Sequence, residues 1–309
     1  MLDVCLPGTG GMMPLPGRHT ACLTVHCEGA GILVDCGEGT QVALKKAGVN
    51  LRRIDLLLIT HLHGDHIFGL PGLLMSIAAT DRTDPITIAG PAPLKAALGH
   101  FLCLIAGLPF PLEMIEWTEA EVRQLQAPAL QLGQMEVTPF VLKHRVTCYG
   151  YNIELPRLPE FLPQQARQLD VPVAVWKPLQ HGHTVLLEDG RTIMPELVTG
   201  PPRRGLKLTY CTDSLPFPEV ANFAAGADLF ICEGMYGDED KRASLYPKKH
   251  MMMQDAAELA QKAGAKRLWL THYSPATIDP ESYSDDIQAI FEQTEFGYDG
   301  KKDSLTFSS

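Results

Sequence analysis

Thr60-His61-Leu62-His63-Gly64-Asp65-His66 is the stretch that decides the fold, because it places three imidazoles and one carboxylate within six positions. An apolar run over residues 54–60, whose last residue opens this stretch, has the length of a buried strand. Imidazole nitrogens and carboxylate oxygens suit Zn²⁺, Mn²⁺ or Fe. In a loop, His61 and His63 can converge on one ion while Asp65 and His66 face a neighbouring one. The alternative, a polar loop with incidental histidines, explains this density poorly.

Two ions need more ligands than this loop supplies, and three other expected strand ends offer them. His144 follows an apolar segment over residues 137–142, Asp213 follows a strand over 206–211, and His272 follows a strand over 267–271. A single His or Asp at a strand end is often only a cap or a hydrogen-bonded core group. Several strand ends that each deliver a metal-competent residue favour a shared site.

The rest of the chain alternates between strand and helix patterns. A hairpin is expected from strands over residues 21–26 and 32–35, and helices are expected over 39–47, 69–79 and 252–263. Further buried strands are expected over 206–211, 228–233 and 267–271. This alternation predicts a layered α/β sandwich in one domain over residues 1–309.

Composition excludes several classes of protein. The 309 residues are 45% hydrophobic and 20% charged, with a net charge of −10, so neither a disordered chain nor a DNA-binding protein with a basic surface is expected. No segment resembles a signal peptide or a membrane span. The 8 cysteines lack Cys-x-x-Cys spacing, which excludes a zinc ribbon and indicates free thiols of a cytoplasmic protein.

One segment departs from the alternating pattern. Residues 155–178 interleave five prolines with Trp176 and a short helical stretch. We interpret this segment as an inserted, protruding arm rather than a core element. A surface excursion without a function is the alternative.

The metal-ligand pattern, taken with several further motifs, resembles the dinuclear metallo-β-lactamase superfamily. Residues 59–74, ITHLHGDHIFGLPGLL, resemble the ribonuclease Z family of tRNA 3′ endonucleases more narrowly. Supporting matches are DCGEGTQ at residues 35–41, CYGY at 148–151, LEDGR at 187–191 and PPRRG at 201–205. The resemblance implies a four-layered αβ/βα sandwich with a protruding arm.

The resemblance also implies the ligand sets and the reaction. One divalent ion would take His61, His63 and His144, the other would take Asp65, His66 and His272, and Asp213 would bridge them. Zn²⁺ is the expected metal, with Mn²⁺ or Fe possible. Water would attack the phosphodiester, leaving a 3′-hydroxyl on the tRNA and a 5′-phosphate on the trailer.

A general acid is needed for the leaving 3′ oxygen, and His250 resembles the family's histidine in this role. Glu233 matches the acidic residue that would orient it, and with Asp65 these two form the expected catalytic set. Where relatives read His-Glu-Ala-Thr, this chain has Cys-Glu-Gly-Met at residues 232–235. An exposed histidine at a helix start is the alternative for His250.

Substrate contacts are expected from Arg18 and His19 in a Gly-rich loop and from Lys177 in the arm. The partners implied are precursor tRNA and a second copy in a homodimer, with no membrane and no DNA. Two other functions remain open: a di-metal hydrolase of small phosphodiesters or other esters in the same fold, and a metal-binding or RNA-binding protein without catalysis.

Overall fold

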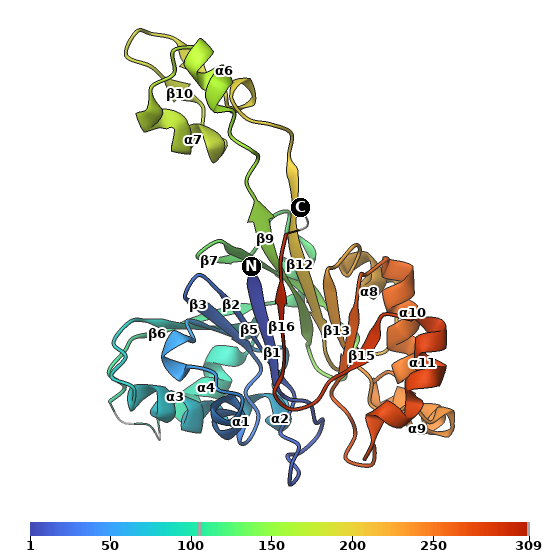
Figure 1. Cartoon of the computed structure of the whole chain (residues 1–309). Helices are drawn as coiled ribbons and strands as arrows, with labels where there is room; N and C mark the ends of the chain where they lie inside the picture. The colour runs from blue at the N-terminus through green and yellow to red at the C-terminus, as the bar shows by residue number, and fades with distance from the viewer. Residues whose placement is uncertain (104, 106, 308–309) are drawn as a thin grey trace. The chain divides into compact units, whose positions relative to one another are not determined.

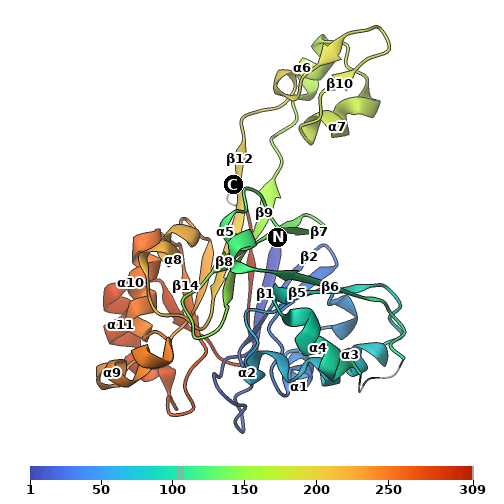
Figure 2. The same ribbon diagram turned by 180° about the vertical axis from the view of Figure 1, so that it is seen from behind.

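The computed structural model describes residues 1–103, 105 and 107–307, and its contacts divide the chain into two compact units. The first unit comprises Met1–Glu154 and Lys207–Ser309, and the second comprises Leu155–Leu206. The first unit contains two seven-stranded sheets, with helices α1, α3 and α4 outside one sheet and α8, α10 and α11 outside the other (Figures 1 and 2). The expected layered α/β sandwich is therefore confirmed.

The first sheet has the strand order β16-β1-β2-β3-β4-β5-β6. Its strands are β16 (Lys301–Leu305), β1 (Leu2–Gly8), β2 (Cys22–Cys27), β3 (Ala30–Val34), β4 (Leu56–Leu58), β5 (Ile86–Pro91) and β6 (Leu112–Trp117). The expected hairpin is confirmed, because β2 pairs antiparallel with β3 across Glu28 and Gly29, which both have positive φ. From β3 to β6 the pairing is parallel.

The helices that cover this sheet bury one apolar face each. They are α1 (Thr40–Lys46), α2 (Gly64–Ile67), α3 (Leu70–Ala78) and α4 (Leu94–Leu102). Leu44, Leu73 and Leu98 pack in one cluster with the strand residues Leu57 and Ile88. Burial of each such side chain contributes on the order of 2 kcal/mol, which offsets the ordering of these short helices.

The second sheet has the strand order β15-β14-β13-β12-β9-β8-β7. Its strands are β15 (Thr294–Phe296), β14 (Leu268–Thr271), β13 (Leu229–Glu233), β12 (Arg203–Cys211), β9 (Tyr149–Arg157), β8 (Met135–Val141) and β7 (Leu130–Leu132). Strands β12 to β15 are parallel, so Cys211, Glu233 and Thr271 lie at neighbouring carboxyl ends. Parallel pairing thereby gathers the polar residues that follow these strands at one edge.

The outer helices of this sheet are α8 (Pro218–Phe223), α10 (Met253–Ala263) and α11 (Ser284–Ile290). Helix α10 ends as the sequence predicts, with Gly264 in the left-handed conformation at φ 60°. Its Ala256, Ala260 and Leu259 join a core cluster with Phe230 of β13. The remaining short elements of this unit are α5 (Glu119–Arg123), α9 (Arg242–Leu245), η1 (Leu51–Arg53), η4 (Glu239–Lys241), η5 (Tyr246–Lys248) and η6 (Pro280–Tyr283).

The second compact unit is longer than the arm over residues 155–178 that the sequence suggested. Its elements after β9 are α6 (Pro163–Gln168), η2 (Val173–Val175), α7 (Trp176–Gln180), β10 (Val185–Leu186), β11 (Thr192–Ile193) and η3 (Pro195–Leu197). It has its own core, in which Ala166 and Val171 pack with Leu179, Ile193 and Val198. Leu179, Ile193 and Val198 of this core lie after residue 178, so the unit extends beyond the expected arm, to Leu206.

Candidate metal centre

The histidine-rich loop lies between β4 and α2, and the other candidate ligands reach it from separate strand ends. Strand β4 is shorter than the sequence suggested, so Thr60 and His61 lie beyond its end. His63 is the N-cap of α2, and Asp65 and His66 lie in its single turn. The seven expected ligands fall into two groups that share no residue: His61, His63, His144 and Asp213, and Asp65, His66 and His272. In each group one ligand atom per residue lies within 4.8 Å of all the others.

Asp213 stands between the two groups, and its two oxygens face different partners. Oδ1 lies 3.1 Å from Nε2 of His272 and 3.5 Å from Nε2 of His66. Oδ2 lies 3.7 Å from Nε2 of His61 and 3.9 Å from Nε2 of His144. This division is the geometry that a bridging carboxylate requires.

The residues fit a divalent cation on two independent grounds. His66 Nε2 and both ring nitrogens of His272 are buried, and none of them makes a well-directed hydrogen bond to a described residue, although carboxylate oxygens lie near them. Such orphaned buried nitrogens are costly unless a ligand satisfies them. In addition, His63 Nδ1 lies 2.9 Å from His61 Nε2 and 3.3 Å from His144 Nε2, so three nitrogens converge on one point. A nitrogen-rich donor set of this kind suits Zn²⁺.

The protonation of the imidazoles differs between the groups. Burial lowers the pKa of His61, His63 and His144, which favours the neutral form that ligates a metal. Burial would also lower the pKa of His66, but the carboxylates of Asp35 and Asp213 outweigh it and raise that pKa well above its usual value. Burial works against the charge of Asp213, yet His272 and His66 hold the pKa of that carboxyl well below its usual range.

Asp35 orients His66, a role that was not predicted from the sequence. The buried Asp35 follows β3 at φ 62° and accepts hydrogen bonds from the Thr60 backbone N–H at 2.9 Å and from His66 Nδ1 at 2.8 Å. A carboxylate behind a ligating imidazole fixes its tautomer and ring orientation. The signal was present in the sequence, because Asp35 opens the DCGEGTQ motif at the end of a strand.

His250 and Glu233 lie beside the cluster and contact each other. His250 Nδ1 lies 2.9 Å from Glu233 Oε2, and the other oxygen of Glu233 accepts from the Ser214 backbone N–H at 2.6 Å. Burial would lower the pKa of His250, but the Glu233 carboxylate outweighs it and raises that pKa. His250 lies three residues before α10 rather than inside it. Together with Asp213 and His272, these two residues form a third group of possible ligands.

Arg18 and His19 bond to the protein itself. Arg18 donates to the carbonyls of Thr277 at 2.6 Å and Ile278 at 2.8 Å, and His19 Nδ1 lies 2.8 Å from Asp299 Oδ2. These bonds hold the Gly-rich loop so that the Met12 backbone N–H donates to Asp65 Oδ2 at 2.8 Å. Lys177 lies in α7 of the second unit. Substrate binding by these three residues stays a prediction.

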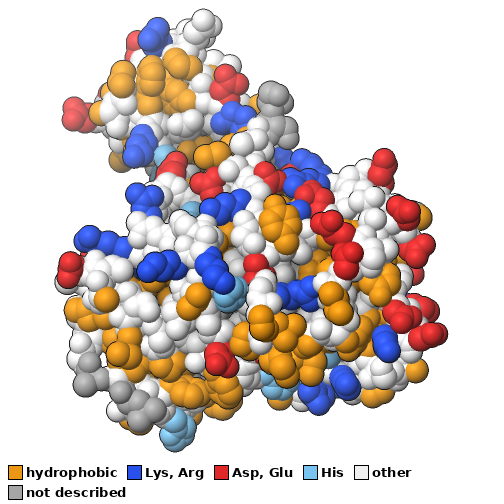
Figure 3. All heavy atoms as spheres, turned by 60° about the horizontal axis from the view of Figure 1, so that its bottom comes forward, with side chains coloured by type: hydrophobic (Ala, Val, Ile, Leu, Met, Phe, Trp, Pro, Cys, Tyr) orange, Lys and Arg blue, Asp and Glu red, His pale blue; other side chains and the backbone are white. Residues whose placement is uncertain are grey.

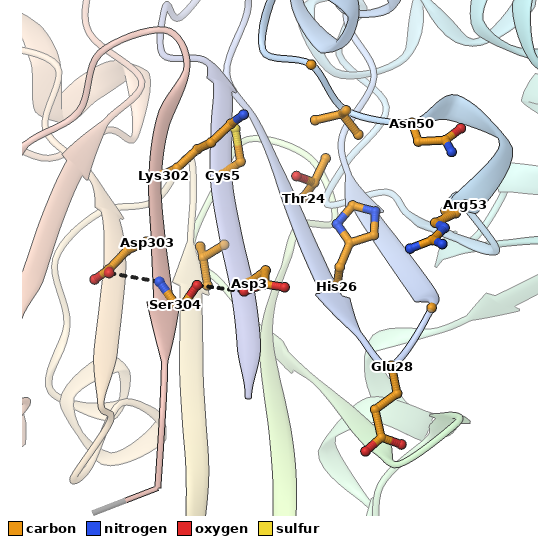
Figure 4. A pocket seen from close by; sticks show the side chains of 14 residues that line it. Asp3, Cys5, Thr24, His26, Glu28, Asn50, Arg53, Lys302, Asp303 and Ser304 are labelled. Carbon is orange, nitrogen blue, oxygen red and sulfur yellow. Dashed lines mark hydrogen bonds between the residues drawn. The ribbon is translucent and has the colours of Figure 1, made fainter.

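A larger groove of about 540 Å³ lies elsewhere, over β1, β2 and the start of β16 (Figure 4). None of the candidate ligands lines it. Its carboxylates are engaged, since Asp3 accepts from the Ser304 hydroxyl and Asp303 pairs with Arg267. The chemistry-bearing residues therefore lie in the smaller pocket of about 270 Å³ around His63, Asp65 and His272.

The fold and the ligand cluster define a protein of the metallo-β-lactamase fold. A family model described as a beta-lactamase superfamily domain matches residues 176–273, and one described as anti-Pycsar protein Apyc1 matches residues 2–107. Among solved structures, human tRNase Z, short form, superimposes with a TM-score of 0.70 at 25% identity over 99% of this chain and 100% of that one. The Bacillus subtilis protein YhfI superimposes with a TM-score of 0.67 at 20% identity over 97% of this chain and 98% of that one, which supports the fold.

The particular family follows from whole-chain sequence relatives. Ribonuclease Z of Lachnoclostridium phytofermentans is 45% identical over 99% of this chain and 99% of its own length. Ribonuclease Z of Agathobacter rectalis is 44% identical over the same shares. The chain belongs to the ribonuclease Z family. Within the described residues, no helix has both the length and the apolar character needed to cross a bilayer.

Proposed function

We propose that this protein is a metal-dependent endoribonuclease that removes 3′ trailers from precursor tRNA. The observation that carries the proposal is the His250–Glu233 pair at 2.9 Å beside the ligand cluster, in a chain that aligns with ribonuclease Z proteins over 99% of its length. A dinuclear hydrolase without an acid could cleave activated esters. A poor leaving group such as a ribose 3′ oxygen needs a proton donor.

The proposed metal ligands are His61, His63 and His144 for one ion, Asp65, His66 and His272 for the other, and Asp213 for both. Zn²⁺ is the metal we propose. When bound, two such cations neutralise charge on the phosphate and supply a nucleophilic water at neutral pH. Asp35 and Glu233 would keep His66 and His250 in place while the substrate binds.

In the reaction, a water oxygen forms a bond to phosphorus while the bond from phosphorus to the 3′ oxygen of the tRNA breaks. His250 uses Nδ1 to contact Glu233, so Nε2 is the nitrogen that would deliver the proton to that 3′ oxygen. The Glu233 carboxylate raises the pKa of His250, which favours the protonated ring that a general acid needs. The products are a tRNA with a 3′-hydroxyl and a trailer with a 5′-phosphate.

We also propose a cytoplasmic homodimer in which the second compact unit, Leu155–Leu206, of one subunit holds the tRNA for the site of the other. The family resemblance supports the assembly. The 8 cysteines, all free, support a reducing compartment. Light scattering of the purified protein tests the dimer, and a monomeric mass with full activity would contradict it.

The test of the function is cleavage of a 3′-extended tRNA by the purified, metal-loaded protein, with both product ends mapped. A 3′-hydroxyl at the end of the tRNA and a 5′-phosphate on the trailer are the expected results. An intact precursor, or a cyclic phosphate left on the tRNA, would overturn the proposal.

A further inference from the structure

The pocket over the ligand cluster has two basic side chains at its rim that the reaction described above does not use. Arg145 follows His144 in the loop after β8, and Lys248 ends η5, two residues before His250. Both are exposed and line the same pocket of about 270 Å³. The face in Figure 3 carries Lys and Arg side chains beside hydrophobic ones.

Neither cation has an ion-pair or side-chain hydrogen-bond partner in the part of the chain that the structure describes. Neighbouring basic residues differ in this respect. Arg242 pairs with Glu239 and Asp255, and Lys249 donates to the carbonyl oxygen of His144 at 2.8 Å. The two rim cations are therefore available to a ligand.

The charge around this pocket favours an anion. Its only carboxylates among the described residues are Asp65 and Asp213, and both face imidazoles of the cluster. A chain with a net charge of −10 gains no long-range attraction for RNA from its overall charge, so local cations must supply it. Phosphate oxygens are the groups that Arg and Lys bind most strongly in RNA.

The position of the pair selects one phosphate of the substrate. Both residues are tied to the side of the cluster where His250 lies, because the His144 and His250 rings are only 5.1 Å apart and Arg145 follows His144. His250 is the proposed acid for the leaving 3′ oxygen, so this is the leaving-group side. That oxygen belongs to the last nucleotide retained in the tRNA.

We propose that Arg145 and Lys248 bind the phosphate on the 5′ side of that last retained nucleotide. The inference rests on the proposed function and extends it with a subsite. The same pocket is lined by the exposed Met12 and the half-buried Tyr236, which provide apolar surface against which the nucleotide's base can pack. The subsite would anchor the retained strand while the P–O bond next to it breaks.

The experiment compares Arg145→Gln and Lys248→Met with the wild-type protein in single-turnover cleavage of a 3′-extended tRNA. Each variant should lower kcat/KM roughly tenfold to a hundredfold, the range for loss of a charge-assisted hydrogen bond. The dependence of binding on salt should fall by about 0.7 in log–log slope for each lost contact. Arg145→Lys keeps the charge and should recover most of the loss. Lys95→Met removes an exposed lysine of α4 outside the pocket and is the matched control.

A second measurement locates the phosphate. Precursors are prepared with one uncharged methylphosphonate, either 5′ of the last retained nucleotide or one position 3′ of the scissile bond. The first substitution should slow the wild-type protein more than either variant, because each variant keeps only one of the two contacts to that phosphate. The second should slow all three proteins by the same factor.

The subsite would be overturned if the variants cleave like the wild type. It would also be overturned if the first methylphosphonate slows the variants by the same factor as the wild-type protein. Either result would leave the proposed function intact. A wild-type protein that leaves the precursor uncleaved would overturn both. Metal content and thermal melting, measured for each variant, separate a binding defect from loss of the cluster. If a variant loses metal, Arg145→Lys with the modified substrates decides the outcome.

Discussion

Lys249 and His144 exchange two hydrogen bonds: the Lys249 ammonium donates to the backbone carbonyl of His144 at 2.8 Å, and His144 Nδ1 lies 3.0 Å from the backbone carbonyl of Lys249. Lys249 adopts a left-handed conformation with φ 61° and ψ 52°, which is uncommon for a residue other than glycine. The exchange fixes the ring of a proposed ligand and the segment that leads to His250. The proposed metal ligand His144 and the proposed acid His250 therefore both depend on the backbone conformation of Lys249.

Lys249→Met removes the ammonium and leaves the backbone carbonyl that accepts from His144. We expect metal affinity to fall roughly tenfold to a hundredfold, as for other partners that orient ligands. A titration against a competing chelator measures it. Lys45→Met, on the exposed surface of α1, is the control. Unchanged affinity would mean that the ammonium has no positioning role.

Asp213→Asn should abolish turnover without unfolding the protein, because each oxygen of Asp213 faces a different group of imidazoles. Metal content should drop in both groups, whereas His63→Ala should affect only the group formed with His61 and His144. Metal analysis and circular dichroism of the purified variants measure this difference. Near wild-type activity of Asp213→Asn at limiting metal would refute the dinuclear assignment.

His250→Ala should lower cleavage of precursor tRNA by roughly 10² to 10⁴, the usual contribution of a general acid, with metal retained. A nitrophenyl phosphodiester has a leaving group that needs no proton, so its hydrolysis should fall much less. Rates on both substrates are compared. Equal losses would assign His250 a structural or metal-binding role instead, which the third ligand group also permits.

Arg82→Met tests stability away from the site. The guanidinium is buried and donates to the carboxylate of Asp55 and to backbone carbonyls that include those of Arg52 and Ile54. Removing it should cost about 3 kcal/mol, because those acceptors lose their partner. Thermal unfolding should shift down by roughly 5 °C. Arg52→Met, an exposed neighbour, should shift it little.

The structural elements and ligands that depend on local sequence patterns could be predicted from the sequence. The hairpin, α1, α3, α10 and the buried strands β12, β13 and β14 follow from periodicity, glycines and caps, and the seven candidate ligands follow from their positions at strand ends. Partners from distant parts of the chain could not be predicted. Arg18 bonds to carbonyls 259 and 260 residues away, and His19 to an aspartate 280 residues away, so no local signal shows that they are engaged.

The boundary of the second unit was missed for a similar reason. Prolines mark residues 155–178, but the apolar residues that complete the small core, Leu179, Ile193 and Val198, come later and lie in short elements. Strands of two residues such as β10 and β11 carry too little periodicity to read from sequence. The structure thus changes which segment an excision experiment should remove.

Excision of the whole unit tests tRNA capture. Strands β9 and β12, which lead into and out of it, are neighbours in the sheet, and a Cβ on Gly205 would lie only 2.4 Å from the Leu155 carbonyl oxygen. A short Gly/Ser turn can therefore replace residues 158–202. Removing only residues 160–176 would instead divide the small core and leave Leu179 and Val198 exposed.

We expect the shortened protein to bind precursor tRNA more weakly and with a flatter salt dependence, because Arg167 and Lys177 are lost with the unit. Hydrolysis of a small phosphodiester should persist, since no residue of the unit belongs to the ligand cluster. Filter binding at several salt concentrations and ester hydrolysis measure the two effects. Unchanged tRNA affinity would show that capture depends on the pocket rim instead. In that case Arg145 and Lys248 would carry the electrostatic attraction, and combining their substitutions with the excision would abolish the remaining salt dependence.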